Sequence, residues 1–477
     1  MKKIDKNDPL IKYGGYASIM TAIVVVAVIV LNLVVSSFDV KFDLTKNGLY
    51  TLSEDTVSLV ENLNQDVNIY SLYAEGQEIT MVTEILDRYA SHSKHISISN
   101  IDPYTDPAFA VEHTKNGQQP TIGDIVVETD SDFAIIPQED ITDISVDSMS
   151  QTAYLKGIKV EGVLTGTIRQ LTNGAAEAVY ELTGHNETPI GDELKKEMGY
   201  SGFDVQTLDL LQSREIPEDC EILVINGPAV DLSKSESDTI KNYLENGGKA
   251  FITLTLTTQD MPNFDSLLAS YGIADSGRLI VEGSADYVID NNPLYIIPDL
   301  NSESKICESL ASAGTNILTP AAMYVERLDT KRSTVNIETL ASSSTYSYAK
   351  TLEDISGNNA NLAETDPTGP LDIVVSITDT DNNGTENGTK IIVSGASMLL
   401  EDSVNNIVNG GNFGLVMNAF DFLNGTESTG RTKSIGADEY LNITQSKAVV
   451  IMLVSVIVIP LIILLVGFTV FIRRRNK

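Results

Sequence analysis

The sequence has no tryptophan, few aromatic residues of any kind and a shortage of positive charge. Aromatic residues make up 6% of the chain, too few to predict a stacking platform for sugars or bases. Lys and Arg number 32 against 66 Asp and Glu, so the net charge is −34. A surface this acidic argues against nucleic acid and other anionic partners, because like charges repel. The 477 residues are enough for two or three domains, each with its own core.

Signatures of cofactor chemistry are missing as well. Only two cysteines occur, Cys220 and Cys307, and the chain contains neither a CxxC pair nor a GxSxG elbow. A disulfide between the two cysteines and a pair of free thiols both fit the sequence. Gly247–Lys249 reads GGK but lacks the upstream glycine of a phosphate-binding loop. We therefore predict no cofactor and assign no catalytic residue.

Two long apolar segments stand out from this acidic composition. Ala17–Val35 and Ala448–Ile472 contain no charged residue, and each is long enough to cross a bilayer as a helix. The basic residues beyond their outer ends are Lys2, Lys3, Lys6, Lys12, Arg473, Arg474, Arg475 and Lys477. The positive-inside rule then predicts two cytoplasmic tails, residues 1–16 and 473–477, and an extracytoplasmic body at the plasma membrane. A cleaved signal peptide is the alternative for the first segment, but its apolar run is too long and no A-x-A-like site follows it.

Residues 36–174 are predicted to form a small α/β domain. Ser53 is a good N-cap for a helix, because its hydroxyl can accept a hydrogen bond from the first turn. The periodicity further predicts a strand at Val67–Tyr73, a helix at Ile79–Ala90, a strand at His95–Asp102 and a hairpin at Asp124–Pro137. This order is typical of a thioredoxin-like domain, although the redox CxxC is absent.

Residues 175–423 are predicted to form a second α/β domain. Its strands are predicted at Glu177–Gly184, Glu221–Pro228, Lys249–Leu256 and Ile391–Ser397. A helix capped by Thr188 follows the first strand, and a helix with a capping box from Ser233 to Glu236 follows the second. Strands alternating with helices through short turns predict a doubly wound parallel sheet of flavodoxin- or amidotransferase-like type.

The remaining parts of the body are predicted as connections. Asn263–Asn382 is a long insertion before the last predicted strand, and the Ser- and Asn-rich Ser342–Thr368 within it is predicted to be a mobile loop. Residues 424–447 are predicted to be a polar linker into the second apolar segment.

The motif GHNE at Gly184–Glu187 is the first candidate site. It follows a predicted strand, at the edge where open α/β sheets bind their ligands. His185 and Glu187 are suited to an acid–base pair or to half of a metal site. No second histidine or nucleophile accompanies them in sequence, so a structural turn with Gly184 supplying an unusual backbone angle is the favoured interpretation.

The second candidate is the loop that contains Asp379, Asp381 and Asn383. These residues match the first half of a calcium loop of EF-hand type. The twelfth position is Lys390 where the bidentate glutamate should be, and strands flank the loop instead of helices. A polar hairpin is therefore favoured, with calcium binding as the alternative.

Several motifs are spread along the chain in a definite order. The first is FDLTKNGLYTLSEDT at Phe42–Thr56, in which Asp43, Leu44, Thr45, Tyr50 and Ser53 form a membrane-proximal motif. The others, in order, are YELTGHNE, INGPAVDLSKSESDTIKNYLENGGKAFITL, LLASYGI, IIVSGAS, VMNAFDFLNG and IPLIILLVGFTVFIRRR. Together they resemble the GldG-like auxiliary proteins of ABC transporters, a family associated with gliding motility and export. The motifs run from about Val40 to Arg475, so the resemblance covers nearly the whole chain.

The resemblance implies a non-enzymatic accessory subunit beside an ABC-2-type permease and a separate cytoplasmic ATPase. The segment Phe42–Thr56 would then hold the body in a set orientation against the permease, which lowers the entropy cost of docking. Two other hypotheses remain open at this point. One is an extracytoplasmic receptor for a solute or calcium, and the other is a tethered hydrolase-like enzyme that uses His185 and Glu187.

Overall fold

The computed structural model describes residues 49–115, 117–146, 153–173, 176–357, 359, 361–380, 388–425 and 433–434, together with residues 20, 21, 23, 24, 26 and 43. The chain divides into two compact units, residues 1–48 and 49–477. The predicted span 448–472 and most of the predicted span 17–35 lie outside the described residues. Within the described part of the chain, no helix combines the length and the apolar character needed to cross a membrane.

The unit that begins at Leu49 is a mixed α/β structure with parallel and antiparallel sheets. Its first sheet has the order β2-β1-β3-β4, in which β1 is parallel to β2 and antiparallel to β3. The strands are β1 (Val67–Leu72), β2 (Ile96–Ile101), β3 (Ile125–Glu128) and β4 (Phe133–Ile136). The predicted strand, helix, strand and hairpin are thus confirmed in position and order.

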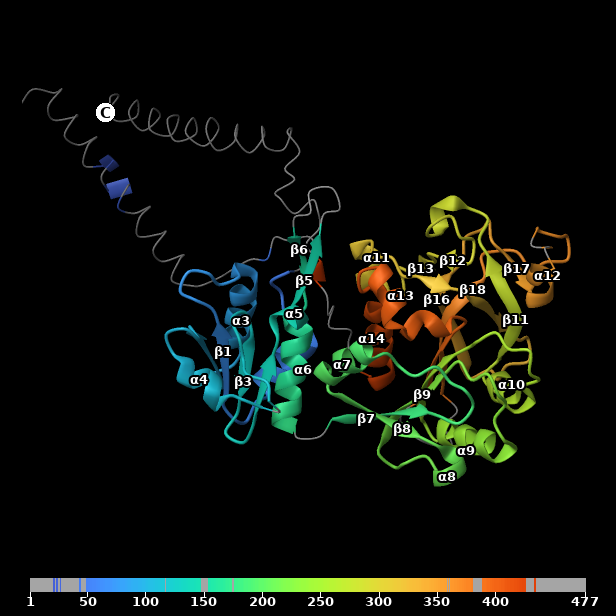
Figure 1. Cartoon of the computed structure of the whole chain (residues 1–477), viewed down its shortest axis with the longest axis horizontal. Coiled ribbons are helices and arrows are strands. Elements are labelled where there is room, and N and C mark those ends of the chain that lie inside the picture. Colours follow the sequence, from blue (N-terminus) through green and yellow to red (C-terminus); the bar gives the residue numbers. More distant parts are fainter. Residues whose placement is uncertain are drawn as a thin grey trace, which may run out of the picture. The chain divides into compact units, whose positions relative to one another are not determined.

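Helices cover this sheet because alternate strand residues on each face are apolar. Ile69 and Val127 belong to a core shared with α2 (Glu54–Glu61), α3 (Thr80–His92) and α6 (Val160–Asn173). Tyr70 and Val126 point to the opposite face and pack with Phe109 of the short helix α4 (Pro107–Glu112). Figure 1 shows α4 beside this sheet.

A small three-stranded sheet, β20-β6-β5, follows in the chain. It comprises β5 (Thr142–Val146), after the one-turn helix α5 (Gln138–Ile141), β6 (Ala153–Ile158) and β20 (Lys433–Ser434). Two residues of the predicted linker 424–447 therefore form a strand, in which Lys433 pairs with Ile158 and Ser434 pairs with Gly157.

The largest sheet has eight strands in the order β13-β16-β18-β19-β10-β9-β7-β8. Its strands are β7 (Glu177–Leu182), β8 (Phe203–Leu208), β9 (Cys220–Asn226), β10 (Lys249–Thr253), β19 (Thr389–Ser394), β18 (Asp372–Asp379), β16 (Val335–Ser342) and β13 (Asp299–Leu300). The neighbours from β8 to β19 are parallel, as predicted for the doubly wound part. The neighbours from β19 to β13 are antiparallel, so part of the predicted insertion instead extends the same sheet.

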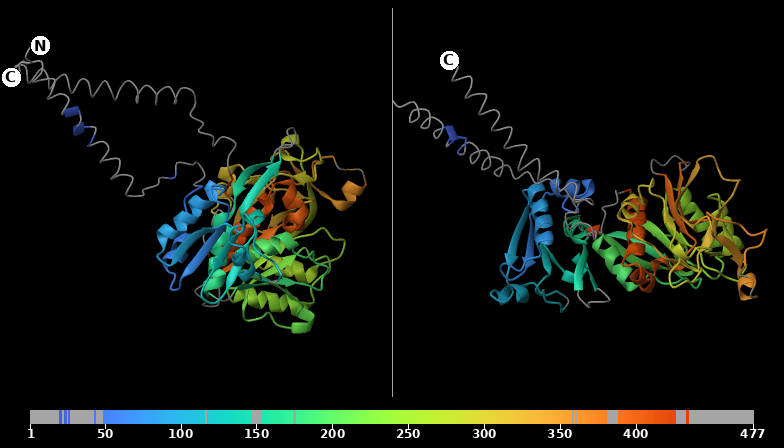
Figure 2. Two further views of the ribbon diagram at one scale, coloured as in Figure 1. Left: turned by 60° about the vertical axis from the view of Figure 1, so that its left-hand side comes forward. Right: turned by 90° about the horizontal axis from the view of Figure 1, so that it is seen from above.

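Both faces of this sheet are covered, as the two further views in Figure 2 show. Ile222 and Val224 of β9 enter one core, and Leu223 and Ile225 enter the other. The helices around the sheet are α7 (Asp192–Tyr200), α8 (Leu210–Ser213), α9 (Lys234–Glu245), α10 (Pro262–Ala269), α13 (Asp402–Ile407) and α14 (Gly411–Asn424), with the short turn η2 (Ser397–Leu400). This burial on both faces explains the continuous apolar runs of the central strands.

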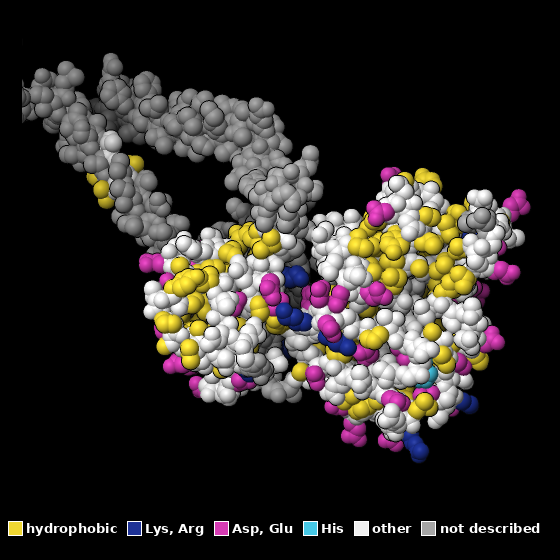
Figure 3. Space-filling view, viewed as in Figure 1, with side chains coloured by type: hydrophobic (Ala, Val, Ile, Leu, Met, Phe, Trp, Pro, Cys, Tyr) yellow, Lys and Arg dark blue, Asp and Glu magenta, His cyan; other side chains and the backbone are white. Residues whose placement is uncertain are grey.

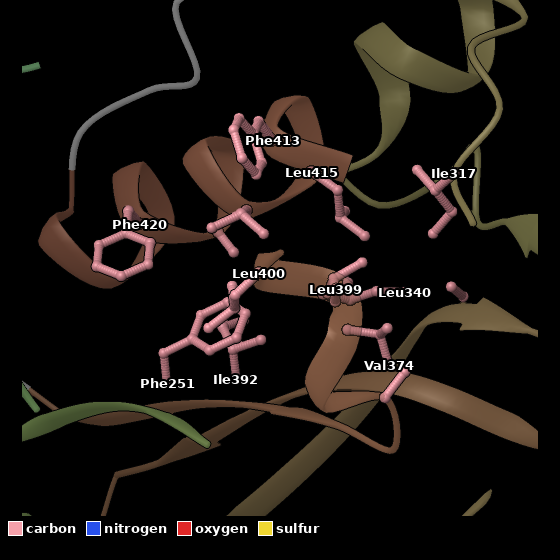
Figure 4. Packing of buried hydrophobic residues seen from close by; sticks show 14 of the residues in the cluster. Phe251, Ile317, Leu340, Val374, Ile392, Leu399, Leu400, Phe413, Leu415 and Phe420 are labelled. Carbon is pink, nitrogen blue, oxygen red and sulfur yellow. The ribbon is translucent and has the colours of Figure 1, made fainter. Parts of the chain in front are cut away.

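Helix α14 provides much of the first core. Its residues Leu415 and Phe420 pack in the same buried cluster as Phe251 and Ile392 of the sheet and Leu399 and Leu400 of η2 (Figure 4). Phe420 stacks on Phe251 of β10, with ring centroids 5.6 Å apart and ring planes 18° apart. Offset aromatic pairs of this kind add to the stabilisation that burial alone provides.

The predicted insertion Asn263–Asn382 also forms a smaller sheet of its own, β15-β11-β17. Besides the strands of the large sheet, the insertion contains β11 (Ile273–Val281), η1 (Ala285–Tyr287), β12 (Tyr295–Ile296), α11 (Glu308–Ala313), β14 (Thr319–Pro320), β15 (Met323–Arg327), β17 (Tyr348–Thr351) and α12 (Leu352–Ser356). The prediction of a mobile loop at Ser342–Thr368 is wrong for the described part of that range. This part contains β17, α12 and a buried ion pair between Lys350 and Asp366 (2.7 Å).

One predicted helix start is also wrong. Helix α7 begins at Asp192 with Gly191 as its N-cap, three residues later than the predicted cap Thr188. The Thr188 backbone amide instead donates to the Asn226 carbonyl of β9 (3.0 Å). Hydrogen bonding to the neighbouring strand has overridden the local preference of a Thr-Pro sequence for starting a helix.

Candidate functional site

The turn after β7 carries the GHNE motif, and its backbone is unusual at two residues. Gly184 has a φ of +119° and Asn186 has a φ of 59°. Glycine is the residue that adopts the first of these angles without strain. The turn can therefore bring His185 back over the end of the strand, in agreement with the role predicted for Gly184.

His185 lies between two glutamates and is only 3% exposed. Its Nδ1 is 2.9 Å from Glu187 Oε1, and its Nε2 is 3.3 Å from Glu236 Oε2. The backbone amide of His185 donates to the second Glu187 oxygen, Oε2, at 2.7 Å. Both ring nitrogens are thus occupied by carboxylates, one from the same turn and one from helix α9.

Glu236 reaches this position because it belongs to the capping box of α9. Its backbone amide donates to Ser233 Oγ (3.3 Å), and its carboxylate accepts from the Ser233 amide (2.8 Å). The predicted capping box is confirmed. The Glu236 carboxylate also faces His185, a contact that the capping-box motif alone does not predict.

The main chain of His185 completes the link between separate segments. Its carbonyl accepts hydrogen bonds from the amides of Ala229 (2.9 Å) and Val230 (3.1 Å). One residue therefore connects the β7 turn, the loop after β9 and the start of α9. These hydrogen bonds tie the loops together at the sheet edge, while Glu236 Oε1 is buried and accepts no hydrogen bond from the described residues.

The electrostatics of the turn favour a positively charged imidazole. The hydrogen bond with Glu187 raises the pKa of His185, burial opposes this rise, and the charges of both glutamates add to it. Burial alone would raise the pKa of Glu236, but hydrogen bonds from Ser233 and the charge of His185 bring it below its ordinary value. The two carboxylates thus favour the protonated form of His185.

This arrangement gives little room for acid–base chemistry. A general base must reach the proton that it removes, whereas both nitrogens of His185 face carboxylates in a closed turn. The neighbouring polar side chains are paired too, since Thr253 Oγ1 donates to Asn226 Oδ1 (2.6 Å) and Asn226 Nδ2 donates to the Thr188 carbonyl (2.6 Å). Across the part of the chain that the structure describes, no three His, Cys, Asp or Glu side chains are grouped to hold a metal ion.

The predicted calcium loop is described at only one of its three named residues. Asp381 and Asn383 lie outside the described residues. Asp379 is buried at the end of β18, where its carboxylate accepts from Arg332 Nη2 at 2.5 Å. This carboxylate thus serves an ion pair within the body.

The membrane-proximal motif is also only partly within the described residues. Leu44 and Thr45 lie outside the described residues, and Asp43 is described without regular structure. Tyr50 packs against the core of the first sheet. Ser53 caps α2 as predicted, accepting from the Thr56 amide (3.2 Å), and its own amide donates to Glu161 Oε1 (2.6 Å).

Both cysteines are free thiols. Cys307 is buried and Cys220 is half-buried. Burial raises the pKa of the Cys220 thiol to about 11 and that of the Cys307 thiol to about 12. Both are protonated at neutral pH and are poor nucleophiles.

A cleft of about 460 Å³ that no sequence motif predicted lies between the α5–β5 segment, α6, α7 and the α13–α14 turn. Its lining includes Asp140, which accepts from Lys196 Nζ (2.8 Å) and from the hydroxyl of Tyr200 (2.5 Å). Helix α6 closely approaches α7 at Gly166, where a Cβ atom would overlap the Tyr200 carbonyl. The lining residues come from four distant stretches of the chain, so no local sequence motif predicts the cleft.

Comparisons with known proteins identify the family. The family described as "ABC-type uncharacterized transport system" matches residues 171–423, just over half of the chain, and a "Domain of unknown function (DUF7088)" matches residues 46–136. No curated protein matches the chain significantly.

Two solved structures show distant similarity. One is titled "mmIFT52 N-terminal domain", with 14% identity and a TM-score of 0.38, covering 52% of this chain and 96% of that one. The other is the exo-β-1,4-mannosidase Op5Man5 from Opitutaceae bacterium strain TAV5, with 9% identity and a TM-score of 0.26, covering 72% of this chain and 48% of that one. Both TM-scores are too low to support a shared fold.

The family match spans β7, the GHNE turn, the capping box of α9, and the sheet through to α14. Most of the stretches on which the sequence resemblance rested lie within this match, whereas Phe42–Thr56 and the stretch that ends at Arg475 lie outside it. The resemblance to an ABC transporter auxiliary family is confirmed. The chain belongs to the ABC-type uncharacterized transport system family of transporter auxiliary proteins.

Proposed function

We propose that this protein is a non-enzymatic, membrane-anchored accessory subunit of an ABC-type transport system. In this proposal its body docks onto an ABC-2-type permease, and a separate cytoplasmic ATPase supplies the energy. The family match over residues 171–423 carries the proposal, because it assigns the protein an accessory role in transport. The partners named here go beyond that assignment.

The closed turn at His185 supports a non-enzymatic role. The residues best suited to catalysis by type, His185 and Glu187, are in contact with each other and with Glu236. Function must be argued from a complete and accessible site, and this cluster has the properties of a structural clamp.

We further propose that Ala17–Val35 and Ala448–Ile472 span the plasma membrane, with both termini in the cytoplasm and the body outside it. Their length, lack of charge and flanking basic residues support this topology.

In fold, we interpret the sheet β2-β1-β3-β4 as thioredoxin-like and the parallel strands from β8 to β19 as flavodoxin- or amidotransferase-like. The order of strands and helices supports both interpretations. In this proposal the two folds serve as rigid scaffolds that present contact surfaces.

Co-purification tests the proposed assembly. The tagged full chain, expressed with the permease and ATPase of its own gene neighbourhood, should retain both after mild detergent extraction. The variant His185→Gln tests the enzymatic alternative. Transport by His185→Gln should fall only as far as the amount of folded, assembled chain falls. Loss of transport at normal assembly would instead favour an enzyme.

Cysteine labelling tests the topology. In a Cys220→Ala/Cys307→Ala background, Leu211→Cys introduces one exposed thiol in the body. A membrane-impermeant maleimide should label this thiol on intact cells. Labelling only after the cells are lysed would contradict the proposed topology.

A further inference from the structure

Helix α4 has exposed apolar residues on its outward side in addition to the buried one on its inward side. Phe109 points inward, where its ring stacks on His113 with centroids 4.0 Å apart. Pro107, Ala108 and Val111 are exposed, and they share one side of the helix because they lie three and four positions apart.

Tyr104 enlarges this outward face in the turn just before the helix. It is 79% exposed, and Val111 is 65% exposed. We call Tyr104, Pro107, Ala108 and Val111 the α4 surface. Isolated apolar residues on a surface need no explanation, but four within eight consecutive residues form a patch of the kind that marks interaction sites.

The backbone of the α4 surface is hydrogen-bonded within its own turn and helix. The Tyr104 amide donates to Asp102 Oδ1 (2.9 Å), and the amides of Thr105 and Asp106 donate to the Asp102 carbonyl. Asp106 then caps the helix by accepting from the Phe109 amide (3.4 Å). A preformed apolar surface loses little conformational entropy when a partner binds.

The charges around the α4 surface have one sign. Asp102, Asp106 and Glu112 flank its residues, and the sequence from 95 to 114 contains no lysine or arginine. The next lysine, Lys115, is engaged, with its Nζ 2.6 Å from Asp132 Oδ1 and over the ring of Phe133. The same imbalance extends over the molecule, where Asp and Glu are spread across the visible face and Lys and Arg gather in few places (Figure 3).

We propose that the α4 surface is a docking site for a protein partner whose contacting surface is apolar and rimmed by lysine or arginine. Resting on the proposed function, the partner is the extracytoplasmic face of the permease. An apolar centre gives affinity and a complementary charged rim gives orientation and association rate.

Charge also favours this partner over two other candidate occupants of the α4 surface. A bilayer with anionic headgroups would repel the acidic rim. A second copy of the chain, with its net charge of −34, would place one acidic rim against another. A basic-rimmed protein surface is the occupant that gains from both the apolar centre and the rim.

Affinity measurements with the full chain and the purified permease in detergent test the proposal. The variant Tyr104→Ser/Val111→Ser should weaken binding at least tenfold, because central aromatic and aliphatic contacts dominate interface energies. The control Tyr346→Ser/Leu211→Ser also removes one tyrosine and one aliphatic residue, which are 68% and 63% exposed, and should change affinity less than twofold. Far-UV circular dichroism should show that both variants remain folded.

A second variant, Asp102→Asn/Glu112→Gln, tests the rim. It should slow association and reduce the dependence of binding on salt, because screening acts on the charged contacts. Unchanged affinity in both variants, while the wild-type complex forms, would overturn the docking site and leave the proposed function standing.

The other outcomes also decide the question. Failure of the wild-type chain to bind the permease at all would overturn the proposed function together with this site. Binding of the full chain to anionic vesicles through the α4 surface, or self-association abolished by Tyr104→Ser/Val111→Ser, would assign the surface to lipid or to a second copy instead.

Discussion

The turn around His185 and the α4 surface invert the usual placement of residues in a protein. At the turn, charged side chains are inside, with His185 3% exposed between Glu187 and Glu236. At the α4 surface, apolar side chains are outside, with Tyr104 79% exposed. Each inversion needs its own physical explanation, since buried charge and exposed apolar area both cost free energy.

The two explanations differ in where the compensating partner lies. The buried charges at the turn find their partners within the same chain, so the cost is offset on folding. The α4 surface has no such compensation among the described residues, and Tyr104, Pro107, Ala108 and Val111 remain exposed. The comparison indicates that residues with catalytic potential can be structural, whereas chemically inert residues carry the contact function.

The largest expected effect comes from removing the cation of the turn. The substitution His185→Ala leaves the carboxylates of Glu187 and Glu236 buried without their partner. The free energy of unfolding should fall by about 3–5 kcal/mol, as for other broken buried ion pairs. Urea denaturation of the full chain in detergent, followed by far-UV circular dichroism, measures this because the chain has no tryptophan.

His95→Ala is the matched control for this prediction. His95 contacts Asp66 at 2.8 Å, but this pair is at the surface, with its carboxylate largely exposed. Its loss should cost less than about 1 kcal/mol. Equal losses for the two histidine variants would show that the turn is not a buried clamp.

The pH dependence of stability should be the next largest effect. The folded pKa of His185 is raised above 6.5, so its contribution to stability is complete below about pH 6.5 and is lost as pH rises through the folded pKa. The folded pKa of Glu236 is lowered below 4.5, so its contribution is present above that value and is lost as pH falls through the folded pKa.

The difference in unfolding free energy between wild type and His185→Gln should therefore be greatest between about pH 4.5 and 6.5. It should shrink at higher pH, because the introduced glutamine does not titrate while His185 of the wild type loses its proton. Denaturation midpoints measured from about pH 4.5 to 9 check this. A constant difference across that range would mean that His185 does not act through its charge.

Local signals explain what the sequence could predict about these two regions. The Ser233–Glu236 capping box and the N-cap at Ser53 depend on residues three apart, and the structure confirms both. Gly184 was predicted as a turn residue from its place after a strand, and its φ of +119° agrees. Contacts between neighbours in sequence are set by propensity and hydrogen bonding that a short window contains.

The contacts between residues far apart in the chain could not be predicted from such local signals. The capping-box glutamate Glu236 meets His185, 51 residues earlier, only because parallel strands bring both turns to one sheet edge. Strands β16 and β18 join the large sheet from within the predicted insertion, and their partners in it are set by pairing with strands distant in the sequence. The exposure of α4 was equally hidden, because a short apolar stretch in sequence indicates burial as readily as docking.

A smaller effect is expected from the cap that supports Glu236. Ser233→Ala removes the oxygen that accepts the Glu236 amide and should lower the free energy of unfolding by about 1 kcal/mol. Ser58→Ala, an exposed serine within α2, is the control and should be neutral or slightly stabilising. A loss for Ser233→Ala as large as that of His185→Ala would mean that cap and clamp form one cooperative unit.

The smallest effect on stability should come from the α4 surface, where the largest effect on binding is expected. Val111→Ser exchanges an exposed residue for another of similar helix propensity, so the free energy of unfolding of the isolated chain should change by no more than about 0.5 kcal/mol. The inward substitution Phe109→Ala in the same helix should cost about 3 kcal/mol, because it leaves a cavity beside His113. If Val111→Ser were as costly as Phe109→Ala, the outward face of α4 would be part of the core, and the contrast with the turn at His185 would fail.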